Sequence, residues 1–164
     1  MNDLNPSAAL RISGYASLFD QADMSGDMVK RGAFAASLLS LPPARIPMLL
    51  GHETDEPIGV WDRLFEDRTG LFVSGRILTG SPRADRTARL VIEGALSGLS
   101  IGYRARRSQS RSAGGRNLLE LDLWEVSVVA FPMLRTARIT QIDDLENTPN
   151  SPPQNIQRLS LIHI

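Results

Sequence analysis

His52 is a residue whose type and setting could support catalysis. It follows a short apolar segment, residues 46–51, and a histidine held at the end of a strand can act as a general base. The alternative is a partly buried histidine that hydrogen-bonds the backbone, and the residue taken alone favours this alternative. The only other histidine, His163, is next to the last residue of the sequence, where we do not expect a rigid site.

Ser100 is flanked by Gly98 and Gly102. This spacing leaves little bulk around the hydroxyl, so a substrate backbone could approach closely and free amides could face an oxyanion. The order helix, turn, strand differs from the strand, turn, helix of the Gly-x-Ser-x-Gly nucleophile elbow. The alternative is an ordinary strand serine with glycines at a bend or bulge.

Glu125 interrupts an apolar pattern in residues 117–131. Leu119, Leu121 and Leu123 alternate with their neighbours and share one face of the expected strand with Glu125. A buried carboxylate is costly unless it is paired. A histidine partner would satisfy it, as in a Ser-His-acid triad, which catalyses acyl transfer. A salt bridge to an arginine, or a change of strand phase at a bulge near Trp124, would satisfy it equally well.

Composition excludes several other kinds of site. The 164 residues include no cysteine, which excludes a thiol nucleophile, a zinc-thiolate centre and disulfides. Eighteen basic residues balance eighteen acidic ones, so net charge gives no argument for nucleic-acid or membrane binding. No secretory signal or apolar run of roughly 20 residues is present. We expect an intracellular domain without cofactor or metal.

Two charged clusters have plain explanations. Asp20, Asp23 and Asp27 lack the spacing and closing glutamate of an EF-hand, which favours a solvated loop over a metal site. An arginine-rich segment, residues 104–116, could contact nucleic acid or an acidic partner. With nine aromatic residues in the chain and one, Tyr103, beside this segment, a solvated mobile loop at 106–115 is favoured.

Hydrophobic periodicity and turn residues predict about seven strands and two helices. The expected strands are 10–19, 46–51, 58–65, 71–78, 99–105, 117–131 and 138–142, and the expected helices are 30–40 and 82–93. Ser81 and Pro82 form the entry of the second helix. The pattern indicates an α+β domain, mainly antiparallel and barrel-like, with the helices packed on it. We expect residues 1–142 to form this domain and 143–164 to be a flexible tail.

Several segments together resemble the tailed-phage prohead maturation proteases, a family distantly similar in fold to the herpesvirus assembly proteases. The resemblance extends over roughly residues 10–142. Its segments are 14–19, 26–29, 31–34, 48–52 (Met-Leu-Leu-Gly-His), 57–59, 98–103 (Gly-Leu-Ser-Ile-Gly-Tyr), 124–129 (Trp-Glu-Val-Ser-Val-Val) and Pro132. The sequence departs from the family pattern at Gly51 and around Pro132, where many relatives carry other residues.

This resemblance implies a serine endopeptidase with Ser100 as nucleophile, His52 as base and Glu125 as acid, and Asp122 is the reserve for the acid. It also implies a herpesvirus-protease-like fold. A catalytically inactive barrel module for capsid assembly or scaffolding is the alternative.

The resemblance further implies substrates and a location. The substrates would be scaffolding protein or the scaffold-like segment of the major capsid protein, with self-cleavage of the chain. The location would be the bacterial host cytoplasm, inside assembling proheads of a phage, a prophage or a gene transfer agent. The protein could be a homo-oligomer, and we expect no nucleic-acid or membrane partner.

Overall fold

Strands make up most of the described chain. The computed structural model describes residues 9–145 and 159–160. The strands are β1 (Ala9–Leu18), β2 (Met28–Val29), β3 (Pro47–Leu50), β4 (Gly59–Glu66), β5 (Gly70–Leu78), β6 (Gly98–Ser110), β7 (Arg116–Val129), β8 (Ile139–Leu145) and β9 (Leu159–Ser160). The helices are α1 (Ala35–Ser40) and α2 (Pro82–Ile92), with one 3-10 turn, η1 (Pro43–Arg45).

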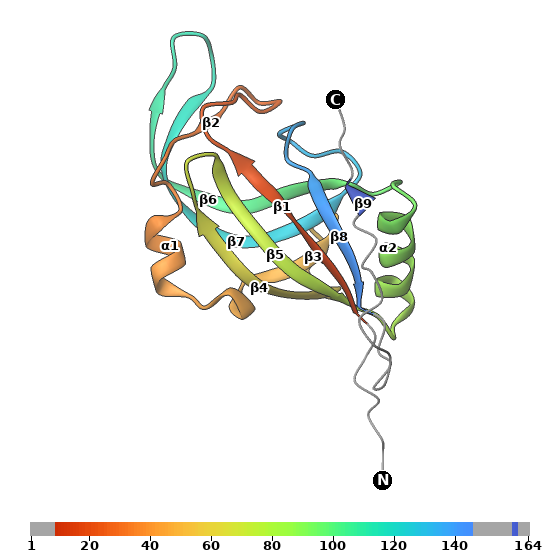
Figure 1. The fold of residues 1–164 in the computed structure, drawn as a ribbon. Coiled ribbons are helices and arrows are strands. Elements are labelled where there is room, and N and C mark those ends of the chain that lie inside the picture. The colour runs from red at the N-terminus through yellow and green to blue at the C-terminus, as the bar shows by residue number, and fades with distance from the viewer. Residues whose placement is uncertain (1–8, 146–158, 161–164) are drawn as a thin grey trace.

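These strands form one curved, mixed sheet (Figure 1). Its order is β2-β7-β3-β4-β5-β1-β8-β9, and β6 pairs along the other edge of β7. Most neighbours are antiparallel, but β2 and β3 both run parallel to β7. The two helices lie at opposite ends of the sheet (Figure 1). The expected α+β class is therefore confirmed.

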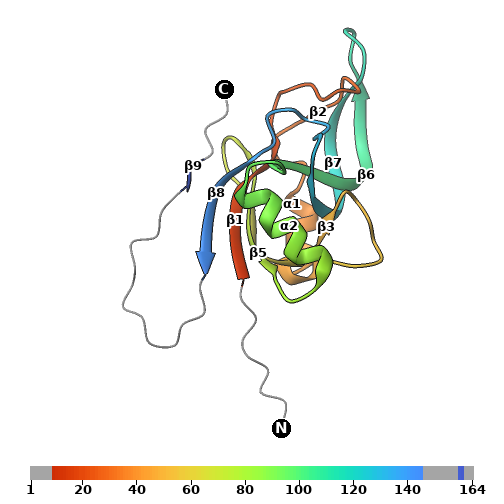
Figure 2. The ribbon, with the colours of Figure 1, turned by 90° about the vertical axis from the view of Figure 1, so that its right-hand side faces the viewer.

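The expected barrel is not confirmed, because the sheet is not closed in the part of the chain that is described. An isolated bridge between Gly98 and Arg138 connects the start of β6 to the segment before β8. Two backbone hydrogen bonds flank it, Leu99 N to Ala137 O (2.9 Å) and Ile139 N to Ser97 O (2.8 Å). Beyond this point β6 pairs with β7 alone, and the two strands extend away from the sheet as a hairpin (Figure 2).

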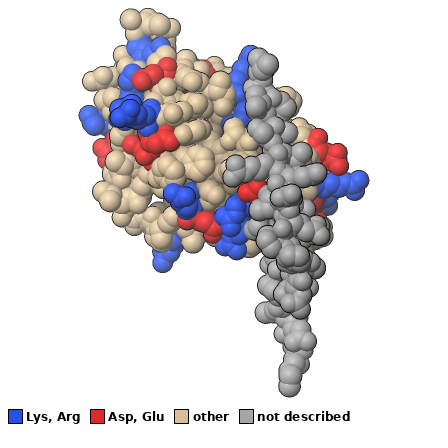
Figure 3. Space-filling model, viewed as in Figure 1, with Lys and Arg blue, Asp and Glu red and all other residues tan. Residues whose placement is uncertain are grey.

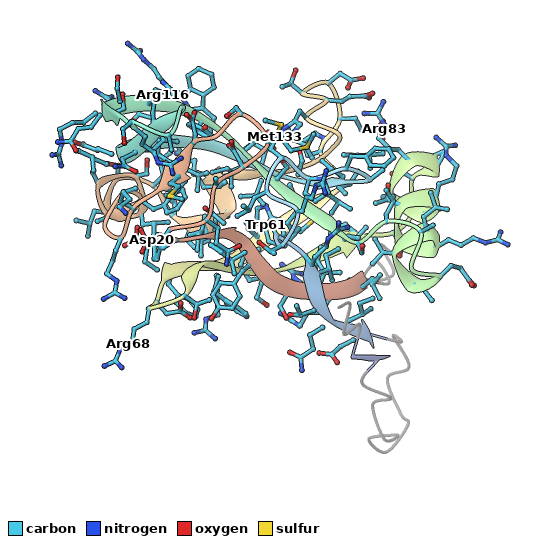
Figure 4. The ribbon with its side chains drawn as sticks, turned by 90° about the horizontal axis from the view of Figure 1, so that it is seen from above. Asp20, Trp61, Arg68, Arg83, Arg116 and Met133 are labelled. Carbon is cyan, nitrogen blue, oxygen red and sulfur yellow. The ribbon has the colours of Figure 1, made fainter. Side chains whose placement is uncertain are left out.

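The buried core lies within the curve of the sheet. Trp61 of β4 is fully buried and lies in the middle of the molecule (Figure 4). Its indole Nε1 donates a hydrogen bond of 3.3 Å to the carbonyl of Val126 and so links β4 to β7. Helix α2 contributes Ala84, Ala88 and Val91 to the same core, so the helix adds an apolar face to the open side of the sheet.

Helix α2 begins and ends as its sequence predicts. The Ser81 hydroxyl accepts a hydrogen bond from Ala84 N, and Pro82 occupies the first turn. At the other end Gly94 has a φ of +80°, which glycine adopts without strain. Hydrogen bonds from Gly94 N to Val91 O and from Ala95 N to Leu90 O complete a Schellman motif. This motif turns the chain toward β6, the strand that carries Ser100.

Some element boundaries differ from expectation because tertiary contacts override the local pattern. Helix α1 begins at Ala35 instead of residue 30, since the carboxylate of Glu66 accepts hydrogen bonds from Gly32 N and Phe34 N and holds a turn there. Strand β6 continues to Ser110 through the segment expected to be a loop, because it pairs with β7 along its whole length.

Strand β8 pairs with β1 through Leu145, three residues beyond the domain boundary expected from the sequence. The short β2 and β9 had no sequence signal. Most of the expected tail, 146–158 and 161–164 with His163, lies outside the described residues. The division of the chain at residue 142 therefore stays a prediction.

Charged side chains of both signs are interspersed on the face shown in Figure 3. In the arginine-rich segment, Arg106 pairs with Asp122 and Arg107 with Glu120 across the β6–β7 hairpin. Arg116 pairs with Asp27. Among the described residues no helix combines the length and apolarity needed to cross a bilayer.

Two phenylalanines provide a test of the assigned core. Phe34 is fully buried, whereas Phe131 is 91% exposed. We expect Phe34→Ala to lower the free energy of unfolding by about 3–5 kcal/mol and Phe131→Ala to change it by less than about 0.5 kcal/mol. Urea unfolding followed by tryptophan fluorescence measures both values. Equal losses in the two variants would contradict the core described above.

Candidate active site

Strand β7 lies between β6, which carries the candidate nucleophile Ser100, and β3, which is followed by the candidate base His52. On one edge Ser127 lies opposite Ser100 of β6. On the other edge Ser127 pairs with Leu49 of β3, and the chain reaches His52 just after β3 ends. Residues directly opposite in an antiparallel pair share a face, so Ser100, Ser127 and Glu125 lie on one side of the sheet.

His52 lies in a tight turn. The turn is closed by a hydrogen bond of 3.1 Å from Glu53 N to Leu50 O, and its two central residues, Gly51 and His52, have φ values of +58° and +63°. Positive φ at both central positions is the pattern of a type I′ turn. Glycine adopts it freely, but histidine does so at a cost of order 1 kcal/mol. The turn directs the amide of His52 at the Ser127 hydroxyl, 3.0 Å away.

Glu125 joins His52 to Ser127. One carboxylate oxygen, Oε1, contacts His52 Nδ1, and the other, Oε2, accepts a hydrogen bond of 2.7 Å from the Ser127 hydroxyl. The Glu125 side chain is 10% exposed, whereas that of His52 is 43% exposed. The carboxylate is therefore buried with both oxygens occupied, and the imidazole extends from it toward solvent.

A bulge in β7 places Glu125 on a different face of the strand from the one that the sequence pattern predicts. Gly102 pairs with Glu125, but the next residue of β6, Tyr103, pairs with Leu123, so Trp124 is an extra residue on β7. Such an insertion switches the faces of the strand. Glu125 therefore does not continue the core face of Leu123. A phase change near Trp124 and a histidine partner for Glu125 are two of the alternatives that the sequence offers, and the structure contains both.

Gly102 provides the space that the carboxylate occupies. A Cβ at this position would overlap Glu125 Oε1 and lie 2.8 Å from both Cγ and Cδ of Glu125. No side chain larger than hydrogen fits there while Glu125 keeps its place. The second glycine beside Ser100 thus has a packing role as well as the steric one expected from sequence.

Ser100 lies two strands from the chain that carries His52. Its residue is 4% exposed, and its hydroxyl makes no hydrogen bond to any residue within the described ranges. Two strand spacings amount to about 10 Å, which an imidazole and a serine side chain can bridge only across a small residue. Ser127 is that residue. The structure thus joins His52 to Glu125 and places Ser100 on the same face without a formed Ser100–His52 hydrogen bond.

A cavity of about 90 Å³ lies beside Ser100. Its walls come from β1, β6 and the segment after β7, and they include Leu18, Ile101, Tyr103 and Leu134. Burial, with the nearby carboxylates of Asp23 and Asp27, raises the pKa of the Tyr103 hydroxyl above its ordinary value. The Arg116 guanidinium lowers the pKa of Asp27 by hydrogen bonding to it. The lining of the cavity therefore combines apolar side chains with the carboxylates of Asp23 and Asp27, from the segment between β1 and β2.

The remaining candidate residues have other partners. Asp122, the reserve acid, is paired with Arg106 at 2.7 Å and is not part of the His52 contact. Asp20 pairs with Lys30, and the Asp23 carboxylate accepts hydrogen bonds within its own loop. Ser127 is not among the site residues predicted from the sequence. Its signal was a hydroxyl two residues after Glu125 in a run of valines.

Gly102→Ala tests the fit around Glu125. The added methyl must displace the carboxylate, and we expect a loss of about 1–3 kcal/mol in the free energy of unfolding. In a Glu125→Ala background the same substitution meets no carboxylate, so its cost should be much smaller. Denaturant unfolding of the four proteins measures this coupling. An equal cost in both backgrounds would show that Gly102 is needed for another reason.

Ser127→Ala tests the buried hydroxyl. The substitution leaves Glu125 Oε2 and the amide of His52 without their described partner, and we expect it to cost about 1–3 kcal/mol of stability. Ser108→Ala, an exposed serine on β6, is the matched control and should change stability by less than about 0.5 kcal/mol. The free energy of unfolding in urea distinguishes them, and indistinguishable values would argue against the network.

Comparison with other proteins identifies the family of the chain. A family model described as "Caudovirus prohead serine protease" matches residues 2–151. The prohead protease of Enterobacteria phage HK97 is 32% identical over 136 residues, which are 81% of this chain and 60% of the phage protein. The chain therefore spans about three fifths of the length of this curated relative.

Solved structures share the fold. The capsid assembly protease of bacteriophage T4, gp21, aligns with a TM-score of 0.59 at 12% identity and covers 73% of this chain and 80% of its own. KSHV protease, solved in complex with a hexapeptide phosphonate inhibitor, aligns with a TM-score of 0.53 at 18% identity over 79% of this chain and 63% of its own. These likenesses confirm the expected herpesvirus-protease-like fold. The family match over most of the sequence shows that the chain belongs to the caudovirus prohead serine protease family.

Proposed function

We propose that the chain is a serine endopeptidase of prohead maturation in which Ser100 is the nucleophile, His52 the general base and Glu125 the acid that orients it. The observation that carries this proposal is the contact between His52 Nδ1 and Glu125 Oε1 on the sheet face that also bears Ser100. A carboxylate bound to one imidazole nitrogen leaves the other nitrogen as the proton acceptor, which is the arrangement a serine nucleophile requires.

The reaction is acyl transfer to Ser100 and then to water. His52 Nε2 takes the Ser100 proton as the oxygen attacks the peptide carbonyl, and it returns that proton to the departing amine. Water, deprotonated by the same nitrogen, then attacks the acyl ester and releases Ser100. Glu125 stabilises the imidazolium formed in both halves, because its oxygen Oε1 remains in contact with Nδ1.

Family membership supports the choice of substrate. The proposed substrates are the scaffolding protein or the scaffold-like segment of the major capsid protein, which meet the enzyme inside an assembling prohead in the host cytoplasm. Self-cleavage after residue 142 is part of the same proposal. The HK97 relative is named a prohead protease and the T4 neighbour a capsid assembly protease, and both names fit this class of substrate.

An inactive assembly module is the less favoured reading. A module without catalysis does not require a histidine at positive φ or a carboxylate buried against that histidine. Each of these features costs free energy that a purely structural domain would avoid. Their occurrence together at one point of the sheet favours the enzyme.

Co-expression with a major capsid protein and a scaffolding protein of the same source tests the proposal. We expect the wild-type chain to trim one of these proteins, and Ser100→Ala to abolish trimming, because the attacking oxygen is gone. Ser108→Ala on the same strand is the matched control and should trim normally. Intact-mass measurement of all chains detects each cut, including cuts after residue 142 of the protease itself.

A fluorophosphonate probe supplies a readout that needs no natural substrate. We expect one covalent adduct, located on Ser100 by peptide mass spectrometry, and its loss in His52→Ala. Trimming that persists in Ser100→Ala, or an adduct on another serine, would reject the assigned nucleophile. Absence of both trimming and labelling in the wild-type chain would favour the inactive module.

A further inference from the structure

The loop after His52 has little packing of its own. Between β3 and β4 no side chain from residue 51 to 57 is buried, and Ile58 is the first that is. His52 itself is fixed at its amide by Ser127, but nothing in the apolar core holds the residues that follow it. The loop must therefore be held by polar contacts.

Those contacts converge on Arg83 in the first turn of α2. Its Nη1 donates a hydrogen bond of 3.0 Å to Asp55 Oδ1. Its Nη2 lies 3.3 Å from Glu53 Oε2, and its Nε lies 3.4 Å from Glu56 Oε2. All three guanidinium nitrogens thus face carboxylates of one loop, and Figure 4 shows Arg83 at the end of α2 beside it.

Charge and burial distinguish Arg83 from the other paired cations. Its side chain is 20% exposed, the least of any lysine or arginine in an ion pair among the described residues. The guanidinium lowers the pKa of Asp55 by hydrogen bonding to it. One cation faces three carboxylates, so its removal would leave like charges repelling one another within four residues of His52.

The place of Arg83 on the helix is unfavourable by itself. The first turn of a helix carries a partial positive charge, so it favours acidic residues and disfavours arginine. Arg86 and Arg89, on the same helix, are exposed and have no ion pair within the described residues. The position of Arg83 is accounted for by the loop that it binds and not by α2.

We propose that Arg83 is a positioning residue that holds His52 in register with Glu125 by clamping the loop through Glu53, Asp55 and Glu56. The proposal rests on the proposed function, in which His52 is the base. Arg83 acts only through the loop, because its contacts end at Glu53 and none reaches the imidazole. The planar guanidinium has donors directed at three acceptors, a geometry that the point charge of lysine does not reproduce.

The test compares Arg83→Ala and Arg83→Lys with Arg86→Ala as the matched control. For cleavage of a capsid-derived peptide we expect kcat to fall about 10- to 100-fold in Arg83→Ala, as for a displaced catalytic group, with KM nearly unchanged. Arg83→Lys should recover only part of this loss. Arg86→Ala should match the wild type, and thermal unfolding establishes that every variant is folded.

Neutralising the three carboxylates of the loop distinguishes their mutual repulsion from the simple loss of the Arg83 side chain. In a Glu53→Gln, Asp55→Asn, Glu56→Gln background no unbalanced charge remains, so adding Arg83→Ala should cost much less activity than it does in the wild type. An equal loss of kcat in both backgrounds would overturn the clamp, as would an unchanged kcat in folded Arg83→Ala.

NMR of the His52 imidazole keeps this proposal distinct from the proposed function. We expect the wild-type ring to show one narrow Cε1–H signal, assigned with His52→Ala, and the ring in Arg83→Ala to show an altered shift and broadening. If Arg83→Ala alters the ring signal but the wild-type chain has no peptidase activity, the clamp is supported and the proposed function is rejected. An unaltered ring signal in folded Arg83→Ala would overturn the clamp whatever the activity.

Discussion

One extra residue in β7 determines which side chains of that strand enter the core and which face the site. Before Trp124, Leu121 and Leu123 are buried in the core, and after it Val126 and Val128 are. A shift of one residue exchanges the two faces of a strand. Without the bulge, a strand that kept Leu123 in the core would also point Glu125 into it.

The bulge is possible because the edge of β7 beside it is bound by a helix instead of a strand. The Ser37 hydroxyl of α1 accepts a hydrogen bond from Leu123 N and donates one to Leu121 O. Ala33 O accepts a further bond from Leu121 N. Along this edge of β7, β2 pairs before the bulge and β3 pairs after it. In the gap, these partners take the place of a neighbouring strand and satisfy the backbone groups of Leu121 and Leu123.

The sequence predicted those features that depend on local pattern. Strands β4 and β5, the Ser81 cap of α2 and the α+β class follow from alternation and capping residues, and they are confirmed. The pairing of His52 with Glu125 was one of the open alternatives, whereas the catalytic roles stay predictions. The full length of β6, the late start of α1, the open sheet and the loop contacts of Arg83 depend on residues distant in sequence, which periodicity does not report.

The parallel pairing of β3 with β7 has a consequence for the order in which the protein is made. His52 and Glu125 are 73 residues apart, and pairings of such long range form late in folding. During translation His52 and Ser100 leave the ribosome before the strand that lies between them. In a nascent chain the contact between His52 and Glu125 is therefore absent, and it forms only when β7 enters the sheet. The topology itself therefore delays the assembly of the candidate site until β7 has been made.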